Sequence, residues 1–114
     1  MKVEIKHPVF GKHCWKDCPF DDVKYLRIPH HHTFWYRVTS DVSHPDRALE
    51  FIMLRLEVAK QIHKLYPFED GLYDFGGRSC EMLSSELEKV LHDRYHQPFE
   101  VSVSEDDTYR GGSF

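Results

Sequence analysis

The chain has few cysteines, no long apolar run and no excess of positive charge. Among its 114 residues, cysteine occurs only at positions 14, 18 and 80. So small and odd a number argues against a disulfide scaffold and favours a reducing compartment. No apolar run approaches the length that spans a bilayer, and no charged-then-apolar leader opens the sequence. We therefore expect a cytoplasmic protein that does not insert into membranes.

The charge balance limits the classes of partner that we expect the protein to bind. The formal net charge is -4 at pH 7, and there is no basic run. Nucleic acids and anionic membranes select basic surfaces, so we expect neither as a partner. Hydrophobic residues make up 40% and charged residues 30%, which is typical of a globular domain. The length fits a single domain, residues 1–114, with its own core.

Histidine is plentiful: there are nine, and three of them are consecutive at positions 30 to 32. The surrounding stretch, residues 29–38, is rich in aromatic and β-branched residues and predicts a β-strand. Because strand side chains alternate between faces, His30 and His32 share one face above an apolar row. Neutral imidazoles in this arrangement suit Zn²⁺, although two ligands do not make a complete site. The alternative is a polar strand end with solvated histidines.

The first ten residues also alternate, with Val3, Ile5 and His7 on one face, and predict a strand. Proline donates no ladder hydrogen bond, so we expect this strand to end at Pro8 or soon after. His7 would then stand at the end of an apolar face, as His30 and His32 do.

The next segment, residues 11–22, has the glycine, proline and aspartate residues of a loop. It contains His13, Cys14 and Cys18. This Cys-x-x-x-Cys with a neighbouring histidine is compatible with a second metal site. Buried or idle thiols are the alternative.

Two helices are predicted in the middle of the chain. Leu49, Ile52, Leu56, Ala59 and Ile62 recur at helical spacing, and Ser43 or Asp46 could cap this helix. A loop over 66–77 follows, and Ser79 is placed to cap a second helix that closes before Pro98. Phe99, Val101, Val103 and Glu105 alternate as a late strand, and residues near Tyr109 could form a short closing strand. The order β-β-α-α-β-(β) predicts an α+β fold with two helices on one face of an antiparallel sheet.

Three segments together resemble the 6-pyruvoyltetrahydropterin synthases and the related 6-carboxy-5,6,7,8-tetrahydropterin synthases of the queuosine pathway. His30-His31-His32-Thr33-Phe34 is similar to the family's H-G-H-[NS]-[YF] strand motif. Arg78-Ser79-Cys80-Glu81 is similar to its [PT]-[TS]-[SA]-E helix start, and Val101-Ser102-Val103-Ser104-Glu105 to its V-x-V-x-E strand. The resemblance covers most of the chain from His7 to Tyr109. It implies the tunnelling fold, a ββααββ unit.

The resemblance also implies a site. His30 and His32 would be two of three zinc ligands, and the third would be a histidine ending the first strand: His7, with His13 in reserve. Glu105 would anchor a pterin or related purine-like ring through paired N–H bonds. The family's oligomers imply a homo-oligomer, a trimer-based hexamer.

The catalytic residues of the family have no matching positions here. No cysteine lies a few residues before His30, and Cys18 is farther upstream. The leucine-led Asp-His pair after the first helix is missing, and nothing in the spacing singles out His63, Asp70 or Asp74 as a substitute. The sequence thus leaves three interpretations: a zinc-dependent tetrahydropterin synthase-like lyase, a non-catalytic ligand-binding or structural module, or a small α+β domain with incidental histidines.

Overall fold

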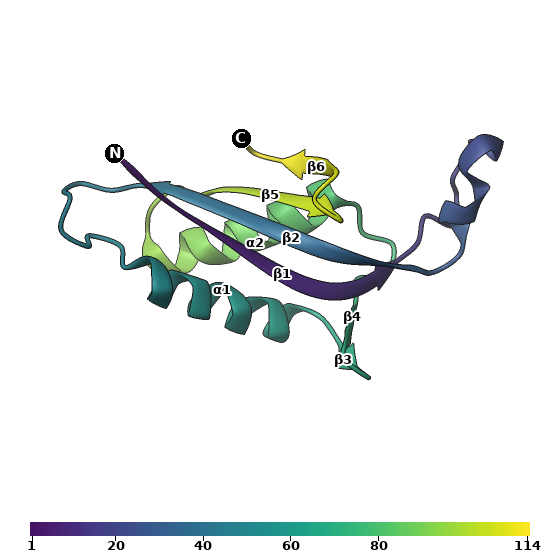
Figure 1. Ribbon diagram of the computed structural model, residues 1–114, viewed down its shortest axis with the longest axis horizontal. Coiled ribbons are helices and arrows are strands. Elements are labelled where there is room, and N and C mark those ends of the chain that lie inside the picture. Colours follow the sequence, from purple (N-terminus) through teal and green to yellow (C-terminus); the bar gives the residue numbers. More distant parts are fainter.

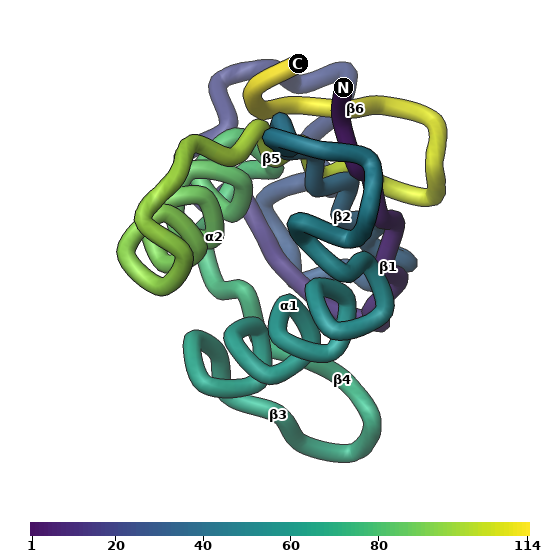
Figure 2. Tube along the Cα trace, turned by 90° about the vertical axis from the view of Figure 1, so that its left-hand side faces the viewer, coloured from purple at the N-terminus to yellow at the C-terminus, as the bar shows by residue number.

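The computed structural model describes all 114 residues as one six-stranded sheet with two long helices on one face (Figures 1 and 2). In chain order the elements are β1 (Lys2–His13), the 3₁₀ segment η1 (Asp21–Arg27), β2 (His30–Asp41), α1 (Phe51–Leu65), β3 (Phe68–Glu69), β4 (Leu72–Asp74), α2 (Cys80–Tyr95), β5 (Glu100–Glu105) and β6 (Tyr109–Gly112). The predicted α+β class is confirmed. Neither long helix has the length and hydrophobicity needed to cross a membrane.

The sheet is built around one long antiparallel pair of strands, β1 and β2, which we call the ribbon. Its strand order is β3-β4-β1-β2-β5-β6, and all neighbours are antiparallel except the short β1–β4 pair. Strands β1 and β2 pair along their whole length, from Lys2 opposite Asp41 to His13 opposite His30. Figure 1 shows these strands crossing most of the molecule side by side, with η1 projecting beyond them. The ribbon therefore brings the end of β1 directly against the start of β2.

The prediction that the first strand ends at Pro8 or soon after is wrong. Strand β1 continues through Pro8 to His13. Its second neighbour, β4, pairs only with Gly11 and Lys12, so Pro8 lies where β1 has a partner on one side alone. Proline is tolerated at such an edge because no ladder bond is required there. The extension moves the end of the strand from His7 to His13.

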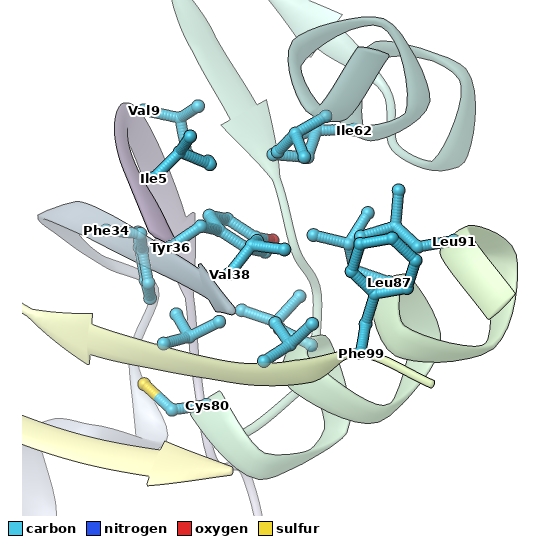
Figure 3. Packing of buried hydrophobic residues seen from close by; sticks show 14 of the residues in the cluster. Ile5, Val9, Phe34, Tyr36, Val38, Ile62, Cys80, Leu87, Leu91 and Phe99 are labelled. Carbon is cyan, nitrogen blue, oxygen red and sulfur yellow. The ribbon is translucent and has the colours of Figure 1, made fainter. Parts of the chain in front are cut away.

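The core lies between the sheet and the helices (Figure 3). The even-numbered residues of β2 face it, and Phe34, Tyr36 and Val38 are fully buried. They are the continuation of the face that carries His30 and His32, as the strand alternation predicts. The two histidines therefore sit at the end of a rigid, packed row, and packing of this kind fixes where a strand directs its side chains.

Helix α1 begins later than predicted, and a different stripe of it faces the core. Its N-cap is Glu50, whose carboxylate accepts from the backbone N–H groups of Ile52 and Met53; Ser43 and Asp46 do not cap it. The buried stripe is Leu54, Val58 and Ile62, while Ile52 and Leu56 are exposed. The helix carries two apolar stripes, and periodicity alone cannot choose between them.

The later elements follow the prediction more closely. Ser79 caps α2, its Oγ accepting from the Met82 N–H at 3.2 Å. Strand β5 ends at Glu105, and β6 is the short closing strand. The loop predicted over residues 66–77 instead contains the hairpin of β3 and β4, with Asp70 and Gly71 at positive φ in its turn. Two such short strands give too little alternation to be detected from the sequence.

Candidate metal centre and adjoining cavity

Three imidazoles meet where the long ribbon ends. The β1–β2 register puts His13 opposite His30 and Gly11 opposite His32, so the rings of His13, His30 and His32 form one cluster. One ligand nitrogen from each ring lies within 4.8 Å of the other two. The ring centroids are 4.7 to 5.6 Å apart. Beneath them, the Phe34 ring packs edge-on against His13 and His32.

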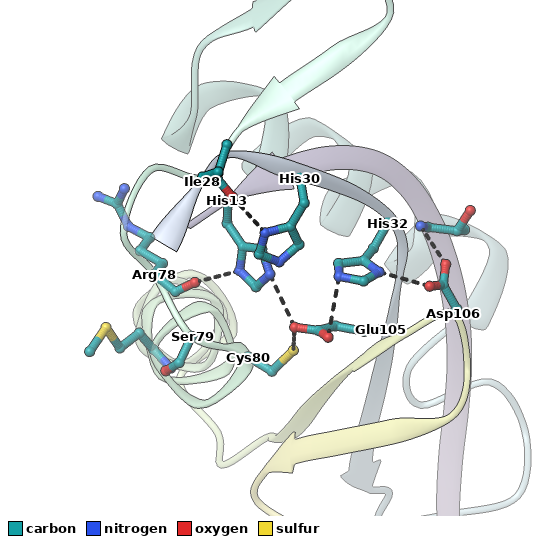
Figure 4. A network of polar contacts seen from close by, with 11 residues as sticks. His13, Ile28, His30, His32, Arg78, Ser79, Cys80, Glu105 and Asp106 are labelled. Atoms are coloured by element: carbon teal, nitrogen blue, oxygen red, sulfur yellow. Dashed lines mark hydrogen bonds and ion pairs between the residues drawn. The ribbon is translucent and has the colours of Figure 1, made fainter. Parts of the chain in front are cut away.

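Each of these rings is held through its Nδ1 atom (Figure 4). The Nδ1 contacts are 2.8 Å to Arg78 O for His13, 2.9 Å to Ile28 O for His30, and 2.7 Å to Asp106 Oδ2 for His32. A carbonyl or carboxylate oxygen can only accept, so Nδ1 carries a proton, and in the neutral ring Nε2 keeps its lone pair. All three Nε2 atoms are buried, and the only group that approaches any of them is the Glu105 carboxylate, beside His13 and His32. This is the arrangement of metal-binding histidines with a second shell that fixes the tautomer.

His7 lies elsewhere on the ribbon. It pairs with Tyr36, about 20 Å along β1 from His13 at the usual rise per residue. Burial and the nearby Arg55 lower the pKa of His7. The structure therefore brings the reserve ligand, His13, to His30 and His32 and leaves His7 outside the cluster. His7 was favoured as the third ligand because the first strand was expected to end near Pro8.

Glu105 stands beside the cluster, at the end of β5. Its Oε1 lies 3.1 Å from His13 Nε2, and its Oε2 lies 3.4 Å from His32 Nε2. Contact with His13 and the nearby His32 hold the pKa of Glu105 below its usual value, although burial opposes this. Burial alone would lower the pKa of His13, but Glu105 and the Arg78 carbonyl raise it. The carboxylate is thus held in its ionised form and faces the His13 and His32 rings.

A cavity of about 580 Å³ opens next to Glu105 and the histidines. Trp15 and Leu26 line one side, and Cys80 and Met82, at the start of α2, line another; His13, His30 and Glu105 stand on its wall. This volume lies within the usual range for small-molecule sites, and an apolar lining with a few convergent polar groups is typical of them. The cavity and the histidine cluster form one continuous site.

Four residues were considered above as replacements for the family's catalytic groups, and none of them lines this cavity. Cys18 is buried, with its Sγ 3.8 Å from the Phe20 carbonyl. His63 Nδ1 lies 3.0 Å from the Tyr73 hydroxyl. Asp70 is exposed in the β3–β4 turn, and Asp74 accepts from the Gly76 N–H. Of the two interpretations of His13, Cys14 and Cys18, the structure supports buried free thiols and not a second metal site, because the His13 ring belongs to the three-histidine cluster.

Two residues of the site were not predicted to belong to it. Cys80 was noted only as part of a helix-start motif, yet its Sγ lies 3.9 Å from Glu105 Oε1 in the cavity wall. Burial, then the charges of Glu105 and Glu81, raise the pKa of the Cys80 thiol to about 12. Asp106 follows Glu105 in a turn at positive φ and holds His32. An acidic pair just after a strand was the only signal for Asp106 in the sequence.

A clamp holds the loop that orients His13. The Glu86 carboxylate on α2 accepts from Arg78 Nε at 2.9 and 3.0 Å and also from the Tyr66 hydroxyl. The guanidinium of Arg78 lies over the Tyr66 ring. Because the Arg78 carbonyl accepts from His13, this clamp fixes the direction of the His13 ring.

The fold and the site define a class: an α+β sheet under two helices, with a histidine cluster where its longest strands end. Among solved structures, the chain matches 6-pyruvoyl tetrahydropterin synthase from Plasmodium falciparum with a TM-score of 0.68. The match covers 97% of this chain and 94% of that one, at 14% sequence identity. No family model and no curated protein matches the sequence. The chain therefore has the tunnelling fold of that synthase.

Proposed function

We propose that this protein binds Zn²⁺ through His13, His30 and His32 and holds a pterin or a related purine-like ring in the adjoining cavity. The observation that carries the proposal is the convergence of three buried histidine rings whose Nε2 atoms have no neighbouring acceptor or donor other than the Glu105 carboxylate. Neutral imidazole nitrogen is a preferred zinc ligand, and three protein ligands leave one position open for a substrate. The likeness of the fold to a pterin enzyme supports the choice of ring.

In this proposal each group of residues has its own role. The Arg78 and Ile28 carbonyls and the Asp106 carboxylate keep the three Nε2 lone pairs directed at the ion. Bound zinc would supply Lewis-acid polarisation of substrate oxygens. Glu105, ionised on the cavity wall, accepts from the paired N–H groups of the ring, and charge-assisted pairs of this kind are strong. Trp15, Leu26 and Met82 offer apolar surface to the faces of the ring.

Ring binding by the site is compatible with two functions, one catalytic and one not. The first is a zinc-dependent tetrahydropterin synthase-like lyase; the second is a non-catalytic ligand-binding or structural module. One observation favours the second: Cys18, His63, Asp70 and Asp74 all lie away from the cavity. General acid–base catalysis needs a group that is within reach of the proton and has a pKa near the working pH. Cys80 does line the cavity, but its pKa is raised to about 12. We therefore propose ring binding with weak or no turnover.

We further propose a homo-oligomer, a trimer-based hexamer, in the cytoplasm. The outer edge of β1 from Lys2 to Phe10 and the outer edge of β6 have no strand beside them. Proteins cover or pair such edges, and the resembled family pairs them between subunits. The three free thiols fit a reducing compartment. Light scattering at micromolar concentration tests the assembly, and a monomer would contradict it.

Titration of zinc-loaded protein with pterins and guanine-like rings tests the function. We expect saturable binding of rings that carry an adjacent N–H and amine, and little conversion of 7,8-dihydroneopterin triphosphate. Rapid turnover would make the protein a synthase with a displaced catalytic group, and a Cys18→Ala variant would show whether that group is Cys18. If no ring binds to the zinc-loaded protein, the proposal fails.

A further inference from the structure

The other face of the sheet, away from the helices, carries a second polar site. There the register places Lys6 opposite Arg37, and Arg37 opposite Ser102, in one row across β1, β2 and β5. The neighbouring row contains Trp35, opposite Ser104, which is in turn opposite Arg110 on β6. Together these side chains line a hollow of about 160 Å³. We call it the sheet hollow.

The sheet hollow concentrates positive charge at a cost to stability. Lys6 and Arg37 are directly opposite each other, and like charges in such cross-strand pairs are destabilising. Asp107 offsets Lys6, with Nζ to Oδ2 at 3.3 Å, and Glu4 lies 3.5 Å from Arg37 Nε. Arg110 has no carboxylate within ion-pair distance and lies over the Phe114 ring. The lining therefore keeps one cation that no acid neutralises.

Two donors in the sheet hollow lack acceptors. Arg37 Nε and Ser102 Oγ are buried atoms without a hydrogen-bond partner, and Ser102 is only 1% exposed. The 3.5 Å approach of Glu4 to Arg37 Nε does not have hydrogen-bond geometry. A buried donor without an acceptor is costly, and such groups are rare in folded proteins. Both residues line the hollow, and an anion with several oxygens there would offer acceptors to this wall and meet the excess charge.

We propose that the sheet hollow binds a phosphate group, either free phosphate or the end of a phosphate monoester. Arginine and lysine supply the charge, and Arg37 and Ser102 supply the directed hydrogen bonds that a tetrahedral oxyanion accepts. The site is distinct from the metal centre, because its side chains point to the opposite face of the sheet. Two features link the two sites: the β5–β6 turn, where Asp106 holds His32 and the adjacent Asp107 holds Lys6, and Arg110 on β6, which lines the sheet hollow and also the cavity beside the histidines.

Calorimetric titration of metal-free protein with inorganic phosphate tests this proposal, with chloride keeping the ionic strength constant. We expect saturable binding of one phosphate per chain. Arg37→Gln should weaken it by at least about tenfold, the usual effect of losing a charged hydrogen bond. Ser102→Ala, which keeps the charge and removes only a hydroxyl, should weaken it about threefold to tenfold. A parallel titration with methyl phosphate distinguishes the two sources of the group, since tighter binding of the ester would identify a monoester.

Two controls separate binding in the sheet hollow from attraction by net charge and from binding at the histidines. Lys60→Gln removes one exposed positive charge from α1 and should leave phosphate binding unchanged. The His30→Ala, His32→Ala variant should also bind phosphate normally, because the histidines face the other side of the sheet. The absence of saturable binding would overturn the proposal. So would an equal loss in Lys60→Gln and Arg37→Gln, since that would indicate attraction by net charge alone.

Discussion

Oε1 of Glu105 lies 3.1 Å from Nε2 of His13. His13 Nδ1 already donates to the Arg78 carbonyl, so a neutral His13 would turn a lone pair toward the carboxylate. The contact is favourable when a positive charge is present, whether a proton on Nε2 or a metal ion at the three nitrogens. Without metal, the proton explains why the pKa of His13 is raised and that of Glu105 is lowered. A metal ion bound at the three nitrogens would therefore compete with this proton.

Glu105→Gln should weaken the binding of a pterin to the zinc-loaded protein by about tenfold to a hundredfold. A single amide oxygen cannot accept both N–H bonds of the ring, and the loss of a charged hydrogen bond typically costs about 1.5–3 kcal/mol. Fluorescence titration of wild type and variant measures the difference. Equal affinity in the two proteins would remove Glu105 from the ring site.

Asp106→Asn should weaken zinc binding by about tenfold to a hundredfold, the usual cost of losing an outer partner of a ligating histidine. The Asp106 carboxylate holds His32 Nδ1 at 2.7 Å, and asparagine accepts less strongly. Asp107→Asn is the matched control, because Asp107 is in the same turn with a similar positive φ but pairs with Lys6. Competition with a chelator measures both affinities. The same loss of zinc affinity in both variants would mean that the affinity depends on the turn and not on the contact with His32.

The Cys80 thiol should resist alkylation at neutral pH in metal-free protein. Its pKa of about 12, against an ordinary value of 9.0, leaves a thiolate fraction about a thousandfold lower, and the thiolate is the reactive form. The rate should rise about tenfold per pH unit, and Glu105→Gln should increase it because a neighbouring negative charge is removed. Peptide-resolved mass spectrometry separates Cys80 from the other two cysteines. Rapid labelling at neutral pH would show that the thiol is not kept protonated.

Two tyrosines offer a paired test of the core. The Tyr36 hydroxyl is buried without a partner, so Tyr36→Phe should leave the free energy of unfolding unchanged or raise it by about 1 kcal/mol. The Tyr66 hydroxyl donates to Glu86, so Tyr66→Phe should lower that free energy by about 1–2 kcal/mol. Urea denaturation measures both. A clear loss of stability in Tyr36→Phe would mean that its hydroxyl has a partner in the core.

The alternation of residues in β2 was enough to predict the shared face of His30 and His32, and the capping residue was enough to predict the start of α2. Both depend on local patterns, which a sequence records directly. The site residue Asp106 depends instead on a turn that brings it back to His32 from more than seventy residues away. No local pattern contains a contact of that kind.

His13 shows most clearly what could not be predicted from the sequence. A proline normally argues against a strand, yet β1 continues past Pro8 because only one neighbour is present there. That fact belongs to the sheet as a whole and cannot be read from the residues around Pro8. The same holds for α1, where burial of Leu54 and exposure of Ile52 depend on which face the sheet covers.

The most direct test of the proposed metal centre is zinc binding by wild type, His13→Ala and His7→Ala, measured on folded, metal-stripped protein. The two variants remove the same ring from the same strand, but only His13 contacts His30 and His32. We predict one zinc per chain in the wild type, unchanged binding in His7→Ala, and loss of at least about a hundredfold in affinity in His13→Ala. A folded wild-type protein that binds no zinc, or one in which His7→Ala loses the metal and His13→Ala keeps it, would contradict this assignment of the ligands.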